Sequence, residues 1–462
     1  MVFGFEGNGL IAAIGISTWM SWVGQSVDRR MVVASAPVVA LPKPCPERWG
    51  HDGRVTQRTT CLIAGGGPAG IMLGLLLARA GIEVTVAEKH GDFLRDFRGD
   101  TVHASTLQLL GELGLEDRFR AMPHVDLADY RLPLPNGRTI VLGDFSSLPG
   151  PYHHIALAPQ WDLLSLLAET AAEEPSFRLL MNTEVLGPVV DHGRVVGARV
   201  RSADGESVIK ADLTVACDGR NSDLRSGAGM VPHEYRVPYD VWWFRLSRTD
   251  AERESELPTL LPTIKPPDIM LAMSHHAYYQ IAYLAPKGSQ ARLREEGIAS
   301  FRARIARLRP DLADRVDELT SMDELPILDV RMNRLHRWHR PGLLCIGDAA
   351  HAMSPSGGVG VNLAIQDAVA AARCLAEPLR QRWVTDHDLD QVRRRRLFPT
   401  VFLQTGQRLL HATIYEPAMA GLPGGFEAAT LVLRLLPWLS RPVGRLIAIG
   451  PRPETAPAFA RR

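Results

Sequence analysis

The chain has 462 residues, 46% of them hydrophobic and 22% charged, so it is long enough for two domains or for one large unit with interleaved segments. Its 52 basic and 51 acidic side chains give a formal net charge of +1, which argues against a general electrostatic attraction to nucleic acid or to an anionic membrane. Five cysteines without a CxxC pair argue against a disulfide framework and a metal site, and favour a reducing, cytoplasmic environment.

The first 58 residues differ from the rest of the chain. Residues 9–24 (GLIAAIGISTWMSWVG) are apolar but shorter than the roughly 18–20 residues of a spanning helix, and no Lys or Arg precedes them. Four prolines between residues 37 and 46 argue against regular structure. We expect a poorly ordered extension over 1–58. Export or anchoring stays open as the alternative, because Ala34-Ser35-Ala36 resembles a cleavage site.

A glycine-rich fingerprint follows the first predicted strand. Residues 59–64 (TTCLIA) predict a short buried parallel strand, and residues 71–80 (IMLGLLLARA) predict a helix. Between them, GGGPAG at 65–70 fits the G-x-G-x-x-G pattern. A second predicted strand, 82–87 (IEVTVA), ends at Glu88, 18 residues after Gly70. This order of elements is typical of a dinucleotide-binding unit.

The residues of this fingerprint suit the AMP and pyrophosphate end of a dinucleotide. Gly65 permits the tight turn, Gly67 lets the backbone approach a pyrophosphate, and Gly70 lets helix and strand pack closely. The Glu88 carboxylate can accept hydrogen bonds from ribose hydroxyls and would repel a 2′-phosphate. The fingerprint alone is compatible with either FAD or NAD.

The middle of the chain predicts mostly strands. Residues 129–145 predict a hairpin with Asn136-Gly137 at its turn, and residues 183–217 predict a three-stranded meander that runs into DGRNSDLR at 218–225. Residues 237–286 are alternating and aromatic, which predicts a further sheet. A charged helix is expected over 301–319, and mostly helices after 375. Residues 431–449 are apolar but carry three arginines and two prolines, which argues against a stable membrane span.

A second glycine-rich turn occurs in CIGDAAHAMSPSGGVGVN, residues 345–362. Asp348 comes directly after a predicted strand and can hold sugar hydroxyls, whereas Pro355 offers a rigid apolar surface without an N–H donor. A helix predicted from Val361 would point its N-terminal amides at a bound ring. Such amides stabilise negative charge by roughly 0.3–2 kcal/mol, which suits a reduced isoalloxazine better than a second phosphate.

The three motifs at 65–70, 218–225 and 347–362 resemble, in order and spacing, those of the flavin-dependent aromatic hydroxylases of the p-hydroxybenzoate hydroxylase type, the group A flavoprotein monooxygenases. The resemblance covers about residues 59 to 375. It implies an α/β fold, with a Rossmann-like FAD-binding domain interleaved with a β-sheet substrate domain and followed by a mostly helical C-terminal region. The expected segments are 59–125, 151–235 and 331–375 for FAD, 126–150 and 236–330 for substrate, and 376–462 for the helical region.

The resemblance also implies roles for individual residues. Arg98 would lie beside the flavin, Gln160 near the ribityl chain and Pro355 over the flavin face. Arg98 and Pro355 are therefore the expected catalytic residues. Asp348 would bind ribityl hydroxyls, and Asp218 would serve both FAD and the nicotinamide cofactor. The full set of expected cofactor-binding residues is Gly65, Gly67, Ala69, Gly70, Glu88, Arg98, Gln160, Asp218, Gly219, Asp348, Gly358, Gly360, Val361 and Asn362.

The function that the resemblance implies is a FAD-dependent monooxygenase. NADH or NADPH would deliver hydride to FAD, and a flavin hydroperoxide formed with molecular oxygen would hydroxylate an aromatic, polyketide-like or other electron-rich small molecule. A reductase of isoprenoid double bonds and a flavin-binding protein without turnover stay open as alternatives. The halogenases of this scaffold usually carry W-x-W-x-I-P, whereas this chain has Trp242-Trp243 without that motif.

Phenolic substrates are activated by deprotonation, so a base or a hydrogen-bond relay is expected on the substrate side. His351 lies inside the third motif and is expected to be structural rather than catalytic. The sequence does not choose among the remaining candidates, which are Tyr152, His153, His154, His275, His276, Tyr278 and Tyr279.

Overall fold

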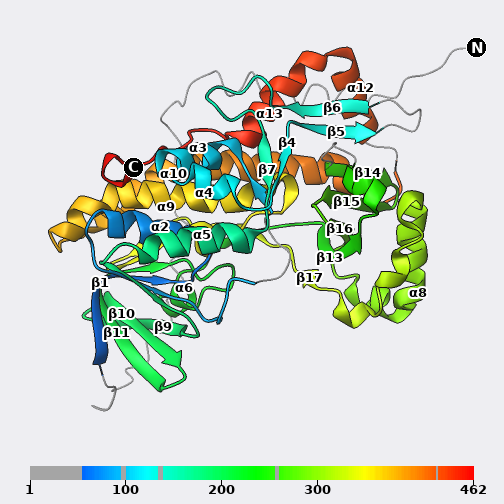
Figure 1. Ribbon diagram of the computed structural model, residues 1–462. Coiled ribbons are helices and arrows are strands. Elements are labelled where there is room, and N and C mark those ends of the chain that lie inside the picture. The colour runs from blue at the N-terminus through cyan, green and yellow to red at the C-terminus, as the bar shows by residue number, and fades with distance from the viewer. Residues whose placement is uncertain (1–54, 95–99, 134–138, 255–259, 423–424) are drawn as a thin grey trace, which may run out of the picture.

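The computed structural model describes residues 55–94, 100–133, 139–254, 260–422 and 425–462 (Figure 1). The expected extension up to residue 54, Arg98 and the Asn136-Gly137 turn lie outside the described residues. Strand β1 (Val55–Ala64) begins four residues before the predicted start at 59. The end of the segment expected to lack regular structure is therefore part of a strand, because its backbone pairs with the neighbouring strand from Val55 onward.

The larger sheet carries the three motifs. Its strands follow the order β19-β20-β11-β1-β2-β8, and β10 and β9 continue from β11 as the predicted antiparallel meander. Strands β20, β11, β1, β2 and β8 run parallel to one another. The bounds are β2 (Val84–Ala87), β8 (Phe177–Leu180), β9 (Glu184–Asp191), β10 (Arg194–Ser202), β11 (Gly205–Ala216), β19 (His339–Arg340) and β20 (Leu343–Cys345).

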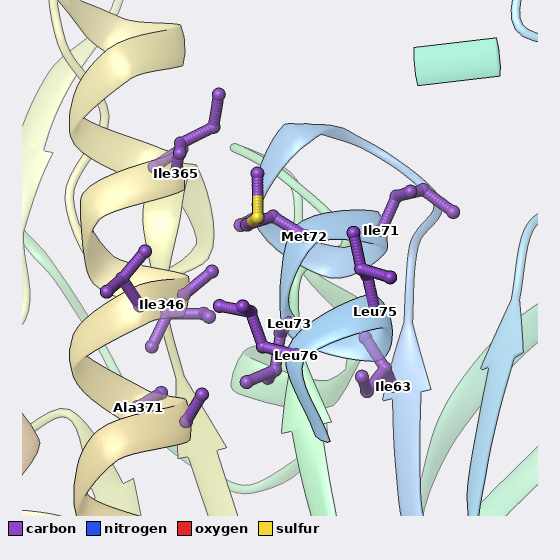
Figure 2. Close-up of a cluster of buried hydrophobic side chains, with 14 of the residues drawn as sticks. Ile63, Ile71, Met72, Leu73, Leu75, Leu76, Ile346, Ile365 and Ala371 are labelled. Carbon is purple, nitrogen blue, oxygen red and sulfur yellow. The ribbon is translucent and has the colours of Figure 1, made fainter. Parts of the chain in front are cut away.

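Two apolar helices pack together beside this sheet. Helix α2 (Pro68–Arg79) is buried from Ala69 to Ala78, and α9 (Val359–Arg380) lies beside it. Figure 2 shows Leu73 and Leu76 of α2 on the side that faces Ile346 and α9. The stretch 356–380 is long and apolar enough to cross a membrane by length and composition, yet 78% of its apolar window is buried inside the fold, as expected of a core helix.

A second, five-stranded antiparallel sheet has the order β14-β15-β16-β13-β17. Successive residues of β13 (Tyr239–Ser247) point to opposite faces, so Trp242 packs toward α8 (Gln290–Leu308) and Trp243 packs into a separate apolar cluster. Both faces are therefore covered. The other strands are β14 (Leu260–Lys265), β15 (Asp268–Ser274), β16 (Tyr278–Pro286) and β17 (Ile327–Leu328).

The charged helix predicted over 301–319 is wrong in its bounds. Helix α8 begins at Gln290, and Gly297 interrupts it with a φ of +77°. Because of this interruption, the sequence pattern did not predict the segment before Gly297 as part of the helix. It ends at Leu308 because Pro310 cannot continue an α-helix, and short 3₁₀ turns follow.

Three small sheets and the C-terminal helices complete the fold (Figure 1). The small sheets pair β3 (Thr101–Val102) and β4 (Val125–Leu127) with β7 (Ile155–Leu157), β5 (Asp129–Pro133) with β6 (Thr139–Asp144), and β12 (His233–Tyr235) with β18 (Met332–Arg334). The remaining helices are α3 (Ala104–Glu112), α4 (Glu116–Arg120), α5 (Gln160–Ala172), α6 (Asp223–Gly227), α7 (Asp250–Glu254), α10 (Asp386–Leu410), α11 (Glu416–Met419), α12 (Gly425–Leu435) and α13 (Ser440–Ala448). The predicted α/β fold with a mostly helical C-terminal region is confirmed.

Candidate active site

The three motifs meet at the carboxyl ends of three neighbouring parallel strands, β1, β11 and β20. A Cβ atom on Gly65 would lie 2.5 Å from the Cys217 carbonyl oxygen, and one on Gly70 would lie 1.9 Å from the Gly65 carbonyl oxygen. The Ile346 amide donates to the Ala216 carbonyl at 3.1 Å. The loops pack too closely for side chains at these two glycines, and open α/β sheets bind their ligands at this edge.

The first turn presents an open helix N-terminus. Gly67 caps α2, and apart from its chain neighbours no atom of the described residues lies within 4 Å of the place where its Cβ would be. The free amides of the first helical turn therefore face open space, which is a ready-made site for a pyrophosphate. Glu88 lies beside this turn, buried, where its Oε2 accepts from the Gly66 amide at 2.7 Å and its Oε1 from the His90 amide at 3.0 Å. This carboxylate is the group that the dinucleotide-binding pattern places beside a ribose.

Asp218 carries a buried carboxylate that the protein only partly satisfies. Its Oδ2 accepts from the Leu224 amide at 3.3 Å, whereas its buried Oδ1 has no hydrogen-bond partner in the part of the chain that the structure describes. Burial raises the pKa of this carboxyl. A buried oxygen without a donor calls for one from a ligand, and a hydroxyl of a bound cofactor would supply it. The adjoining Gly219 has a φ of +83° and open space around it.

The second glycine turn is built to approach its neighbours closely. A Cβ atom on Gly347 would lie 3.3 Å from the Cβ atoms of Ala69 and Ala364, so this turn packs closely against the first motif. Asp348 is 43% exposed and lies 3.9 Å from the Arg220 guanidinium. Helix α9 starts at Val359, two residues before the predicted start, with the left-handed Gly358 as its N-cap. Pro355 is half-buried at the head of this turn, and Gly360 has open space where a Cβ would be.

Asn362 holds this turn in place. Its Oδ1 accepts from the His103 amide at 3.0 Å and from the Thr106 hydroxyl at 2.7 Å, and its Nδ2 donates to the carbonyls of Thr101 and Gly358 at 3.1 and 3.3 Å. These four bonds use the full capacity of the amide. Asn362 therefore ties the Gly358 turn to β3 and α3.

His351 is buried in an ionic cluster, as expected of a structural residue. Its Nε2 lies 2.5 Å from Asp367 Oδ2, which also accepts from the Gly347 amide at 3.1 Å, and Asp367 Oδ1 accepts from Arg396 at 3.0 Å. Burial alone would raise the pKa of Asp367, but the charges of His351 and Arg396 hold it below its usual value. The cluster holds Gly347 in place, because the Gly347 amide donates to Asp367 on α9.

Sequence reasoning missed a polar cluster that encloses Pro355. The Tyr239 hydroxyl lies 2.8 Å from the Ser354 hydroxyl and 2.7 Å from the Ser356 hydroxyl, and His411 Nε2 lies 3.0 Å from Ser354 Oγ. Burial lowers the pKa of His411 to about 4, so this imidazole is neutral at pH 7. The signal was present in the third motif, where two serines flank the proline.

The end of α10 explains how the C-terminal region reaches this cluster. Gln407 donates to the carbonyls of Ser354 and Ser356 at 2.9 and 2.8 Å, and a π-helical turn over His411–Tyr415 continues the helix. Within this turn His411 and Tyr415 stack at 5.8 Å, and both rings pack edge-on against Tyr239. Such turns occur frequently at functional sites.

The structure separates the seven candidate bases. His153 and His276 are exposed, whereas Tyr152 and His154 line a cavity of about 290 Å³ between α3, α4 and the β4–β7 pair. None of the residues around that cavity belongs to the three motifs. His275 is buried and stacks on Tyr278 at 4.8 Å beside the turn between β15 and β16, whereas Tyr279 is buried in the apolar cluster that contains Trp242. Gln160 is the first residue of α5, half-buried beside Trp161.

Known proteins share this fold and sequence pattern. A family model described as a FAD binding domain matches residues 58–400. The 6-methylpretetramide 4-monooxygenase of Streptomyces rimosus is 37% identical over 346 residues, which cover 73% of this chain and 80% of that protein. The 3-demethoxyubiquinol 3-hydroxylase of Escherichia coli (strain K12) is 26% identical, covering 77% of this chain and 90% of that protein.

Solved structures agree on the fold. The OxyS anhydrotetracycline hydroxylase from Streptomyces rimosus superposes with a TM-score of 0.66 at 23% identity, covering 85% of this chain and 76% of that one. P. aeruginosa PqsL in complex with 2-aminobenzoylacetate superposes with a TM-score of 0.67 at 19% identity, covering 82% of this chain and 100% of that one.

Proposed function

This chain belongs to the FAD binding domain family, and from that premise we propose that it hydroxylates a polycyclic, phenol-bearing small molecule with electrons from NADH or NADPH. The chain is a FAD-dependent monooxygenase, an oxidoreductase whose relatives are named as monooxygenases and hydroxylases. What we propose beyond this activity is the class of substrate and the use of NADH or NADPH as the electron donor.

The observation that carries the proposal is the meeting of the three motifs at the carboxyl ends of neighbouring strands, where the buried Oδ1 of Asp218 finds no donor among the described residues. The open amides at Gly67 suit the pyrophosphate of FAD, and Glu88 suits its adenosine ribose. Asp218 and Asp348 would receive hydroxyls of the linking chain. Bound FAD supplies the redox chemistry by accepting hydride and activating oxygen.

The substrate class rests on similarity and on the chemistry of the five-stranded sheet. Several relatives are named for tetracycline-type or other polycyclic aromatic compounds, among them anhydrotetracycline monooxygenase of Streptomyces rimosus and aklavinone 12-hydroxylase of Streptomyces peucetius. The end of the sheet near Trp161 presents the stacked rings of His275 and Tyr278 and the guanidinium of Arg245. Planar rings and a cation suit a flat, anionic aromatic compound.

A cytoplasmic location is part of the same proposal. Cys61, Cys217, Cys345 and Cys374 are free thiols, and burial raises the pKa of Cys61 to about 12. Unpaired and unreactive thiols are usual in a reducing compartment, where NADH and NADPH are also available.

The test uses the purified yellow holoprotein with NADH, then NADPH, first without oxygen and then with it. We expect one nicotinamide to bleach the flavin, and polycyclic phenols such as anhydrotetracycline and 1,8-dihydroxyanthraquinone to speed that step. Mass spectrometry after reaction in ¹⁸O₂ should find one labelled oxygen in the product. Flavin that neither nicotinamide reduces would contradict the proposal, and so would reduced flavin that forms only hydrogen peroxide with every phenol.

A further inference from the structure

A histidine–aspartate pair joins the five-stranded sheet to the small sheet of β3, β7 and β4. His275 lies just after β15 of the five-stranded sheet, and Asp100 lies just before β3 on the FAD side. His275 Nε2 is 3.3 Å from Asp100 Oδ2, and their side chains are only 6% and 4% exposed. The two residues are 175 positions apart (275 minus 100), so folding alone brings them together.

This pair is incompletely satisfied. The groups are close enough for an ion pair, but neither Nε2 of His275 nor Oδ1 of Asp100 has a hydrogen-bond partner within the described ranges. At the structural pair of His351 and Asp367, Nδ1 of the histidine also lacks a partner among the described residues, but both carboxylate oxygens are bonded, because Asp367 accepts from a backbone amide and an arginine. Buried carboxylates that serve only the fold are normally fully paired, so the open Oδ1 of Asp100 points to a ligand beside His275.

The pair lies next to the turn that carries Pro355. The residue after Asp100 is Thr101, whose hydroxyl donates to the Gly358 carbonyl at 3.2 Å. The Asp100 carbonyl accepts from the Ala158 amide at 2.9 Å, two residues before Gln160. Asp100 is therefore fastened between the third motif and the start of α5, both of which are expected to border the flavin.

The surroundings of the pair suit a flat aromatic anion. The His275 ring stacks on Tyr278 with an interplanar angle of 16°. The Arg245 guanidinium lies 4.3 Å from the Tyr278 ring centre and 5.5 Å from that of Trp161. The charged and titratable groups that surround the imidazole are Asp100 before β3, Asp162 on α5, Arg245 and Arg248 at the end of β13, and Tyr278 on β16.

We propose that His275 is the base that deprotonates a phenolic or enolic hydroxyl of the substrate, and that Asp100 is the residue that positions it. This inference rests on the proposed function, since it supplies the substrate activation that hydroxylation of a phenol needs. Nε2 of His275 is turned toward Asp100, so Nδ1 is the nitrogen that receives the proton.

The step balances without any further reagent. The O–H bond of the substrate breaks, its electron pair stays on oxygen as the phenolate, and the proton forms an N–H bond at Nδ1. Asp100 stabilises the resulting imidazolium through Nε2, as a carboxylate does for a catalytic histidine in other enzymes. The proton passes to water when the product leaves. Arg245 lies close enough to offset the charge of the phenolate.

The test compares the FAD-loaded wild type with His275→Gln, Asp100→Asn and the matched control His276→Gln, whose side chain is the exposed neighbour on the same hairpin. The probe is 4-nitrophenol, because its absorbance reports ionisation without turnover. At about pH 6, near the range where histidine changes charge, the wild type and His276→Gln should shift bound probe toward the phenolate. His275→Gln should abolish the shift, and Asp100→Asn should weaken it.

Turnover provides the second readout. With a phenol that the wild type hydroxylates, His275→Gln should lower kcat/KM by about 100-fold or more, and Asp100→Asn should lower it by about 10-fold. In the control His276→Gln, flavin reduction by the nicotinamide and kcat/KM should both match the wild type. The inference is overturned if His275→Gln behaves like His276→Gln, or if the wild type neither binds nor ionises 4-nitrophenol. Failure of the wild type to hydroxylate any phenol contradicts the proposed function instead.

Discussion

At the carboxyl ends of β1, β11 and β20 the functional surface is made of backbone, whereas on the five-stranded sheet it is made of side chains. The first region is formed by glycine turns that pack against each other with no room for a Cβ at Gly65 or Gly70. The second is formed by Tyr239 at one end of β13 and by Arg245 and His275 toward the other, and these side chains meet partners from distant parts of the chain. A backbone site tolerates almost no change of shape, while a side-chain site can change its chemistry without altering the fold.

The sharpest way to break the backbone region is to compare two glycines of the same turn. In Gly70→Ala the new Cβ would lie 1.9 Å from the Gly65 carbonyl oxygen, a backbone atom that cannot move aside. We expect a loss of about 4 kcal/mol or more of folding free energy and no soluble yellow protein. In Gly67→Ala the Cβ meets open space at an ordinary φ of −75°.

Gly67→Ala should therefore leave the folding free energy of the apoprotein within about 1 kcal/mol of the wild type. The FAD affinity should fall by about 100-fold, or about 3 kcal/mol, because the methyl group occupies the space needed by the pyrophosphate. Urea unfolding of the apoproteins and flavin fluorescence titration measure the two effects. Equal loss of stability in both variants would contradict the assignment of Gly67 to the cofactor.

The next largest effect tests the contact between the Pro355 turn and β3. Gly358 has a φ of +63°, and a Cβ there would lie 2.3 Å from the Thr101 hydroxyl. Gly358→Ala should cost about 2–3 kcal/mol through steric clash and backbone strain. Thr101→Ala alone should cost about 1 kcal/mol, because it loses the hydrogen bond to the Gly358 carbonyl.

The double variant should be less destabilised than the sum of the two single variants by about 1 kcal/mol, since removal of the Thr101 hydroxyl relieves the clash. Thermal unfolding of all four proteins with FAD bound completes the cycle. Strict additivity would show that the two residues do not restrain each other.

The two regions also differ in how far the sequence could predict them. The cofactor turns are contiguous motifs. Their glycines, the acids Glu88 and Asp218, and the order of strand and helix could therefore be predicted from the sequence alone. The substrate side is assembled across long separations, as in the bond between Tyr239 and Ser354, which are 115 residues apart. The hydrophobic periodicity of a sequence predicts local helices and strands, but it does not predict a contact between residues so far apart. The predicted bounds of α8 were wrong for a local reason, because Gly297 interrupts the first part of the helix.

A smaller effect is expected where the side chains around Pro355 are changed. Tyr239→Phe removes the hydroxyl that joins Ser354 to Ser356, which should cost about 1–2 kcal/mol of stability. The two serines still lie 2.9 Å apart, so the turn should persist and FAD content should stay that of the wild type. We expect kcat to fall by about 10-fold, because a turn that is less firmly held positions the substrate less accurately.

The matched control for this change is Tyr235→Phe, on the neighbouring strand β12 outside the Pro355 cluster. It should leave kcat and stability close to those of the wild type. Loss of FAD in Tyr239→Phe would show that the side-chain region also supports cofactor binding, and the contrast between the two regions would then be weaker.

The smallest expected effect is a pH dependence that belongs to the side-chain region. Burial lowers the pKa of His411 from 6.5 to about 4, so the folded protein keeps this imidazole neutral where the unfolded chain takes up a proton. The contribution to stability is full above pH 6.5 and is lost as the pH falls toward 4. Between pH 6.5 and 5.5 the loss of folding free energy should be about 1 kcal/mol.

His411→Gln can keep a hydrogen bond to Ser354 without titrating. Over the same pH interval its unfolding free energy should therefore fall by about 1 kcal/mol less than that of the wild type. Parallel curves for the two proteins would mean that His411 is accessible to protons in the folded state, and that the cluster around Pro355 is open to water.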